Sequence, residues 1–263
     1  MGLVYERLGS GPPLVLLHGV GHRRQAWSAV LDRLTPHRDV ILVDLPGHGE
    51  SPPLRLTGRP VLAALLDEVL GLLDELGLER PHFAGNSLGG RLALEAAKVG
   101  RAATVTALSP AGFWRTDGEI RYAKAILEVM EFAGARLQRL APVITRRTPG
   151  RAMVYGAIVN RPSQMSREQA VGDMAAFVAS REALDVILAG IAEFTGRVPS
   201  DVPVIIGWGT RDRLLRPRQA LVAKALLPEA RLVLLPGCGH VPMTDDPALV
   251  ADVLLRGSAD LKS

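Results

Sequence analysis

Short, continuous runs of apolar residues alternate with amphipathic segments along most of this 263-residue chain, and this alternation constrains its fold more than any other feature. The apolar runs lie at 13–18, 40–44, 82–86, 103–108, 202–208 and 231–235. They are apolar at consecutive positions, which is typical of strands covered by helices on both faces. Helical patterns are expected over 60–76, 88–99 and 216–227. The alternation predicts an α/β fold with a mostly parallel, doubly wound sheet.

The alternation stops between residues 112 and 200, where no strand is predicted. One long helix is expected over 117–141, and two more are expected over 165–194. A helical block of this length within a strand–helix series is most simply an inserted cap over the carboxyl edge of the sheet, where open α/β sheets bind ligands. We therefore divide the chain into an α/β core, residues 1–111 and 201–263, and a helical cap, residues 112–200.

Composition and charge argue against several classes of function. The chain has 31 Lys and Arg residues against 27 Asp and Glu, but no nucleic-acid-binding motif, so no nucleic-acid partner is expected. No apolar run approaches the ~20 residues that span a bilayer and no leader pattern is present, so no membrane partner is expected. Cys238 is the only cysteine, which excludes a disulfide framework. We expect a cytoplasmic protein without metal or cofactor, and the sequence leaves open whether it forms a homodimer.

The segment GNSLGG, residues 85–90, is the strongest candidate for a reactive site. The G-x-S-x-G spacing alone arises by chance in roughly one chain in ten of this composition. Here, however, a predicted strand ends at Asn86, Ser87 lies at the turn, and a helical pattern begins at once. Such a turn strains the serine backbone and exposes its hydroxyl, while the flanking glycines allow neighbouring chain to approach. The alternative is an ordinary glycine-rich turn without chemistry.

A serine hydroxyl becomes a nucleophile only when a base removes its proton and a third group orients that base. His240 follows the last predicted strand in PGCGHVP, and Asp212 follows the preceding strand in GTRD. The chain order Ser87, Asp212, His240 matches one of the known triad orders. Asp117 is a rival for the acid, and the alternative is a capping Asp212 with a loop His240.

The oxyanion formed on attack needs two preorganised N–H donors. One donor is expected to be the backbone N–H of Leu88, directly after Ser87. The other is expected from the HGVG loop after the first predicted strand, with Val20 as the best candidate.

The other histidines and the cysteine have simpler interpretations. His18 ends a strand and is expected to brace a loop, while His48 is interpreted as a turn residue. His22 is expected to be solvated rather than to face the pocket. Cys238 is expected to be a small buried side chain.

Five motifs together resemble the α/β-hydrolase superfamily. They are LLHGVG (16–21), DLPGHGES (44–51), GNSLGG (85–90), GTRD (209–212) and GCGHVPMTDDP (237–247), and they occur in the family's order. The resemblance implies an eight-stranded, mostly parallel sheet, no cofactor, and Ser87, Asp212 and His240 as nucleophile, acid and base. Haloalkane dehalogenases and epoxide hydrolases carry aspartate at the elbow, and Gly21 breaks the H-G-x-P of the latter.

The block 112–200 supplies the candidates for a substrate pocket. Trp114, Met153 and Tyr155 are the candidates to line it, which together favour a lipophilic group, and the alternative for each is that it belongs to the core of the cap itself. Seven arginines and no acidic residue occur from Phe132 to Arg167. This run is expected to be a solvated face, and the alternative is that one or two arginines turn inward and clamp a substrate carboxylate.

The sequence therefore predicts a serine hydrolase of the carboxylesterase type (EC 3.1.1), which cleaves small to medium carboxylic esters through an acyl-enzyme on Ser87. The alternative enzyme is a C–C bond hydrolase that acts on ring-cleavage dienoates, so that the small-molecule substrate is an ester or a ketone. The alternative outside catalysis is a ligand receptor on the same fold with slow turnover.

Overall fold

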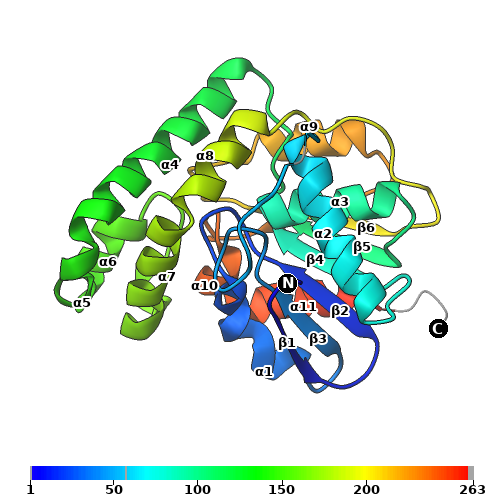
Figure 1. Cartoon of the computed structure of the whole chain (residues 1–263), viewed down its shortest axis with the longest axis horizontal. Coiled ribbons are helices and arrows are strands. Elements are labelled where there is room, and N and C mark those ends of the chain that lie inside the picture. The colour runs from blue at the N-terminus through cyan, green and yellow to red at the C-terminus, as the bar shows by residue number, and fades with distance from the viewer. Residues whose placement is uncertain (1, 57, 260–263) are drawn as a thin grey trace.

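A computed structural model describes residues 2–56 and 58–259 and shows a seven-stranded sheet (Figure 1). The strands are β1 (Tyr5–Gly9), β2 (Pro13–Leu17), β3 (Asp39–Val43), β4 (His82–Asn86), β5 (Thr104–Leu108), β6 (Val204–Gly209) and β7 (Arg231–Leu235). Their order in the sheet is β1-β3-β2-β4-β5-β6-β7. All neighbours pair in parallel except β1, which is antiparallel to β3. The predicted mostly parallel α/β sheet is confirmed.

The sequence patterns miss one strand, β1, and the described sheet has one strand fewer than the eight that the resemblance implies. The sequence of β1, YERLG, is mostly exposed and has no continuous apolar run. Its extended form depends on pairing with β3, in a register that places Tyr5 opposite Val43 and Gly9 opposite Asp39. A strand held by pairing at a sheet edge gives little hydrophobic signal of its own.

Helices cover both faces of the sheet. On one face, α3 (Leu88–Lys98) lies against β2, β4 and β5 and packs on α2 (Val61–Glu75), whose buried stripe includes Leu65 and Val69. On the other face, α1 (Leu31–Leu34) packs on α11 (Pro247–Gly257). The remaining core helices are the 3-10 helix η1 (Arg24–Val30), α9 (Gln219–Leu226) and α10 (Pro242–Asp245).

Five α-helices lie between β5 and β6, and no strand is described there. They are α4 (Asp117–Leu137), α5 (Ala141–Ile144), α6 (Thr148–Tyr155), α7 (Arg167–Ala179) and α8 (Arg181–Gly190), with 3-10 turns η2 (Gln138–Leu140) and η3 (Pro162–Gln164). Residues 112–200 are called the insertion below. Figure 1 shows α4 to α7 grouped to one side of the sheet, with α8 reaching toward the core. Whether the insertion is a domain of its own stays a prediction.

The first helix of the insertion differs from the prediction. The single helix expected over 117–141 ends at Leu137, and a 3-10 turn leads into α5. Pro142 lies in the first turn of α5, where its missing N–H and fixed φ are tolerated. Over residues 2–56 and 58–259, no helix is both long enough and apolar enough to cross a membrane.

Candidate functional site

Ser87 occupies a sharp turn between β4 and α3. Its backbone has φ 55° and ψ −113°, in the region that non-glycine residues rarely adopt. Such a conformation costs on the order of 1–3 kcal/mol and persists only where the surroundings hold it. Here the Ser87 N–H donates to the Leu108 carbonyl (2.9 Å), and the Ser87 carbonyl accepts from the N–H groups of Arg91 (3.0 Å) and Ala111 (3.1 Å).

Two glycines make this turn possible because the backbone crosses itself closely there. A Cβ on Gly85 would lie 2.2 Å from the Gly89 carbonyl carbon. A Cβ on Gly89 would lie 2.1 Å from the carbonyl oxygen of Leu17 at the end of β2. The G-x-S-x-G spacing is therefore a packing requirement of the turn as well as a sequence pattern.

Asp212 and His240 meet in loops that follow β6 and β7. His240 Nδ1 lies 2.8 Å from Asp212 Oδ2, and both side chains are buried. The other carboxylate oxygen, Asp212 Oδ1, accepts from the N–H groups of Leu214 (2.9 Å) and Leu215 (2.8 Å). The rival acid Asp117 is exposed in the first turn of α4. Of the two candidate acids, only Asp212 is paired with His240.

Asn86 ties the elbow to the histidine loop. Its Nδ2 donates to the carbonyls of His240 (2.9 Å) and Leu108 (3.1 Å). Ser87 and His240 line one small cavity of about 20 Å³, called the His240 cavity below. Its other lining residues are Gly19, Val20, His22, Asn86, Leu127, Ile158, Phe177, Leu214 and Val241. Leu127 and Phe177 come from α4 and α7, so the insertion roofs this cavity.

The two expected oxyanion donors lie beside Ser87. Within the part of the chain that the structure describes, neither the Val20 N–H nor the Leu88 N–H donates a hydrogen bond, and Ser87 Oγ makes none either. The Leu88 N–H is the first of α3, where helical N–H groups have no partner within the helix. A Cβ on Gly19 would lie 3.2 Å from Ser87 Cβ, so the HGVG loop passes directly against the serine.

His18 braces this loop, as expected. Its Nε2 accepts from the Leu45 N–H (3.0 Å), which leaves the proton on Nδ1 to donate to the Gly19 carbonyl (2.8 Å). Burial lowers the pKa of His18 well below its usual value, so the ring is neutral. The ring of His48, also buried, lies with its centroid 5.3 Å from that of His18.

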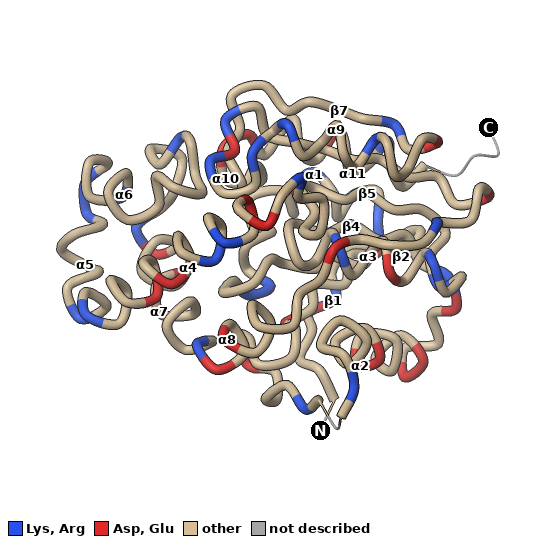
Figure 2. Tube along the Cα trace, turned by 90° about the horizontal axis from the view of Figure 1, so that it is seen from above, with Lys and Arg blue, Asp and Glu red and all other residues tan. Residues whose placement is uncertain are grey.

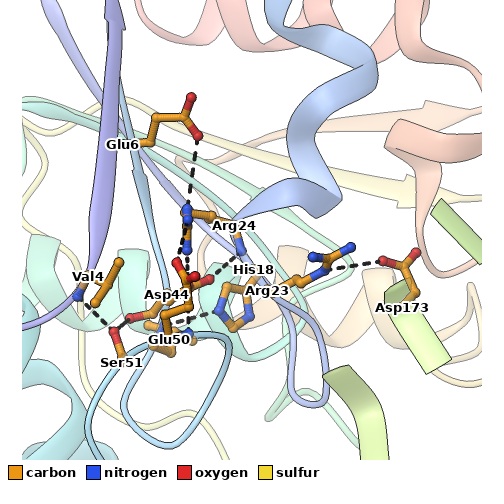
Figure 3. Close-up of polar contacts among 10 residues, drawn as sticks. Val4, Glu6, His18, Arg23, Arg24, Asp44, Glu50, Ser51 and Asp173 are labelled. Carbon is orange, nitrogen blue, oxygen red and sulfur yellow. Dashed lines mark hydrogen bonds and ion pairs between the residues drawn. The ribbon is translucent and has the colours of Figure 1, made fainter. Parts of the chain in front are cut away.

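The DLPGHGES motif (44–51) holds the start of η1, just after the HGVG loop, in place (Figure 3). The Asp44 carboxylate accepts from the Arg24 backbone N–H (2.6 Å) and also pairs with the Arg24 guanidinium. Arg24 in turn contacts Glu50 (2.6 Å), and Ser51 Oγ donates to the Asp44 carbonyl (2.6 Å). A Cβ on Gly49 would lie 2.2 Å from Asp44 Oδ2, so this position requires glycine.

His22 is in a different place from the one expected. It is buried rather than solvated, and it lines the His240 cavity. Burial, with the nearby His240, His48 and Arg23, lowers the pKa of His22 to about 4. Its ring nitrogens make no hydrogen bond within the described residues. The sequence signal that could have placed it is its position two residues after Val20 in the same loop.

The three expected pocket residues fall into two cavities. Trp114 shares with Ser87 and Val20 a cavity of about 40 Å³, called the Trp114 cavity below. Met153 and Tyr155 instead line a separate cavity of about 530 Å³ between α4, α6 and α7, called the insertion cavity below. Neither residue lines a cavity that contains Ser87.

The arginines of the insertion do not reach these cavities. None of the seven between Phe132 and Arg167 lines the His240, Trp114 or insertion cavity. All are exposed except the half-buried Arg151, which donates to the carbonyls of Pro162 (3.0 Å) and Thr145 (2.9 Å). Figure 2 shows basic residues beside α5 and α6, at the outer end of the insertion. The carboxylate clamp is therefore not formed by these side chains.

Cys238 is buried, and burial together with Asp245 and Asp246 raises the pKa of its thiol to about 12. A thiol with such a pKa is a poor nucleophile at neutral pH. Among the described residues, no three His, Cys, Asp or Glu side chains are grouped so that they could hold a metal ion.

Comparison with known proteins places this geometry in a family. Residues 14–253 match the model of the alpha/beta hydrolase family. The chain is 32% identical to epoxide hydrolase EphH of Mycobacterium tuberculosis over 204 residues, which cover 73% of this chain and 92% of the relative. It is 24% identical to Lipase 1 of Psychrobacter immobilis over 259 residues, which cover 92% of this chain and 76% of the relative.

A solved structure shares the fold at lower identity. The 2-hydroxy-6-oxo-6-phenylhexa-2,4-dienoate hydrolase of Rhodococcus sp. strain RHA1 superposes with a TM-score of 0.73 at 21% identity, covering 97% of this chain and 98% of that one. The names of these three proteins point to three different kinds of substrate, so the similarity identifies the family and leaves the substrate open. The chain belongs to the alpha/beta hydrolase family.

Proposed function

We propose that this hydrolase cleaves carboxylic esters through an acyl-enzyme formed on Ser87. The observation that carries the proposal is the shared cavity of Ser87 and His240, with His240 Nδ1 held 2.8 Å from the buried Asp212. Because Asp212 accepts the Nδ1 proton, Nε2 is the ring nitrogen that is free to take the proton of Ser87.

Each step uses a group of this chain. His240 removes the Ser87 proton as Oγ attacks the ester carbonyl, and the N–H groups of Val20 and Leu88 bind the oxyanion. The tetrahedral intermediate collapses, the C–O bond to the alcohol breaks, and His240 donates its proton to the departing oxygen. Water, deprotonated by His240, then attacks the acyl-enzyme and releases the acid. The strain at Ser87 fixes Oγ in place before substrate arrives.

Charge in the cavities does not distinguish an ester from a dienoate. Dienoates from ring cleavage carry a carboxylate, which needs a cationic partner once it is removed from water. Lys124, in the Trp114 cavity, is the one lysine or arginine among the described residues that line the two cavities containing Ser87, and it could pair with such a carboxylate. Serine at position 87 separates this chain from enzymes that use an aspartate at the elbow to open epoxides.

The test compares two serines in similar backbone conformations. Ser109 also has a positive φ (42°), follows the neighbouring strand β5 and is buried, but it lines neither cavity. We expect wild type and Ser109→Ala to hydrolyse p-nitrophenyl butyrate, and Ser87→Ala to lose at least about 10³-fold in kcat. A ring-fission dienoate, assayed in parallel, is expected to be a poor substrate for all three.

Two results would contradict the proposal. Ester hydrolysis that survives Ser87→Ala, with wild-type folding by circular dichroism, removes Ser87 as nucleophile. A wild-type kcat/KM higher for the dienoate than for the ester assigns the enzyme to C–C bond hydrolysis instead.

A further inference from the structure

Two cavities meet at Ser87, and only one of them contains the histidine. Val20, Ser87, Leu127 and Leu214 line both the His240 cavity and the Trp114 cavity. His240 lines the first alone, whereas Leu88 and Trp114 line the second alone. A carbonyl group held at Ser87 therefore has a compartment on each side.

The chemistry assigns the two compartments to the two halves of an ester. The imidazole must lie within hydrogen-bond reach of the departing oxygen to give it a proton, so the alcohol belongs on the His240 side. The acyl group stays covalently attached to Ser87 and takes the other side, the Trp114 cavity. That cavity, at about 40 Å³, has room for a short acyl group only after small side-chain movements.

Phe177 separates the alcohol side from a much larger space. It is the one described residue that lines both the His240 cavity and the insertion cavity. The wall is thin, because Leu127 and Ile158 face the first cavity while their neighbours Ile126 and Ala157 face the second. The insertion cavity, at about 530 Å³, falls in the range of small-molecule binding pockets. The His240 cavity, at about 20 Å³, has space for little more than a water molecule.

The position of Phe177 depends on the loop that carries Val20. A Cβ on Gly21 would lie 2.2 Å from Phe177 Cδ2, so the ring rests directly on this glycine, whose φ is +75°. The Phe177 ring, from α7, thus contacts the HGVG loop, and both line the His240 cavity. Phe177 is therefore the side chain that would have to move to join the two cavities.

The lining of the insertion cavity indicates an apolar occupant. Side chains such as Ile126, Met130 and Met174 form most of its surface. The Tyr155 hydroxyl already donates to the Ala170 carbonyl. None of the described residues that line this cavity is a lysine, arginine, aspartate or glutamate. Val129 and Met153 are exposed, so the cavity opens to solvent on one side, but a charged group would find no ionic partner along its inner wall.

We propose that the insertion cavity binds the alcohol half of the ester and that Phe177 is the gate to it. The substrate class is then the ester of a short carboxylic acid with a long apolar alcohol. This assignment rests on the proposed ester chemistry at Ser87 and adds which half of the substrate each cavity takes.

The test varies the two halves of the substrate separately. One series is acetate esters from ethyl to octyl acetate, and the other is ethyl esters from acetate to octanoate, each below its solubility limit. We expect wild-type kcat/KM to rise with the alcohol chain and not with the acid chain. Phe177→Ala should raise kcat/KM for octyl acetate on the order of tenfold, with no gain for ethyl octanoate.

A bulky residue in the insertion cavity should have the opposite effect. Ala133→Trp on α4 narrows the cavity and should lower kcat/KM for octyl acetate on the order of tenfold while ethyl acetate is unaffected. Glu128→Trp is the matched control, because Glu128 is exposed on the same helix and does not line the cavity. If Ala133→Trp disturbs folding, Met153→Trp narrows the cavity from α6.

The inference fails if these variants change kcat/KM for ethyl octanoate instead of for octyl acetate, because the insertion cavity would then bind the acyl half of the ester. It also fails if neither series responds to the variants. A second measurement separates its failure from that of the ester chemistry. Binding of 1-octanol to Ser87→Ala, measured by calorimetry, should weaken about tenfold when Ala133→Trp is added, and an unchanged affinity overturns the subsite even if esters are cleaved.

Discussion

At the scale of single residues, Ser87 and Ser109 show which part of the elbow the sequence could predict. Both have positive φ at the carboxyl ends of adjacent strands. Only Ser87 is flanked by glycines whose missing Cβ atoms let neighbouring backbone pass, and that spacing is visible in the sequence. Ser109, in the segment Leu108-Ser109-Pro110, has a strained backbone without such flanking glycines in the sequence. Its buried Oγ has no hydrogen-bond partner.

His22 makes an acid-sensitive contribution to stability. Its pKa falls from 6.5 unfolded to about 4 folded, so between these pH values the unfolded chain binds the extra proton. The free energy of unfolding therefore decreases as pH falls from about 6.5 to about 4, by roughly 3 kcal/mol for this residue. We expect the free energy of unfolding, measured by urea titration, to fall less between pH 7 and pH 4.5 in His22→Gln than in wild type.

Other groups act in the same pH range, so the comparison needs a control. His18 and His48 also have lowered pKa values, whereas burial raises that of Asp173 to about 6, which makes folding more favourable as pH falls. These groups are present in both proteins, and the difference isolates His22. His37→Gln, at an exposed position, should keep the wild-type pH dependence. If the free energy of unfolding fell equally between pH 7 and pH 4.5 in His22→Gln and in wild type, His22 would not be held neutral by the fold.

At the scale of elements, the turn between β4 and α3 should be intolerant of a single methyl group. Gly89→Ala places a Cβ against the Leu17 carbonyl oxygen, where two backbone segments would have to separate. We expect a loss of about 3 kcal/mol in the free energy of unfolding, measured by urea denaturation. Gly71→Ala is the control, because Gly71 lies in α2 with nothing within 4 Å, and it should stabilise the protein by about 1 kcal/mol. Similar effects of the two substitutions would contradict this account of the turn.

The elements that the sequence predicted are those with a continuous buried run or a wide apolar stripe. The six core strands agree with the predicted runs to within two residues at each end. The edge strand β1 and the short helices α5 and α6 lack such a signal, because each has at most one fully buried side chain. Their structure depends on the neighbours they pair with or pack against, which single-sequence patterns do not contain.

At the scale of the whole molecule, the sheet order explains why three distant segments meet. β4, β6 and β7 are parallel, so the loops that carry Ser87, Asp212 and His240 leave the sheet at the same edge. This convergence could be predicted from strand order and motifs. The cavities could not, because they depend on how α4 and α7 pack onto the core. The ion pair between Arg23 and Asp173 (4.0 Å) is one contact of this kind, and it links the segment after the HGVG loop to α7 (Figure 3).

The most direct test of the central claim is to trap the covalent intermediate. Wild-type protein mixed with excess p-nitrophenyl butyrate and quenched in acid within the first turnovers should gain the mass of one butyryl group. Peptide mapping should place that group on Ser87. Ser109→Ala should give the same adduct and Ser87→Ala none. A butyryl group on another residue, or steady hydrolysis with no adduct at any quench time, would contradict the proposed acyl-enzyme.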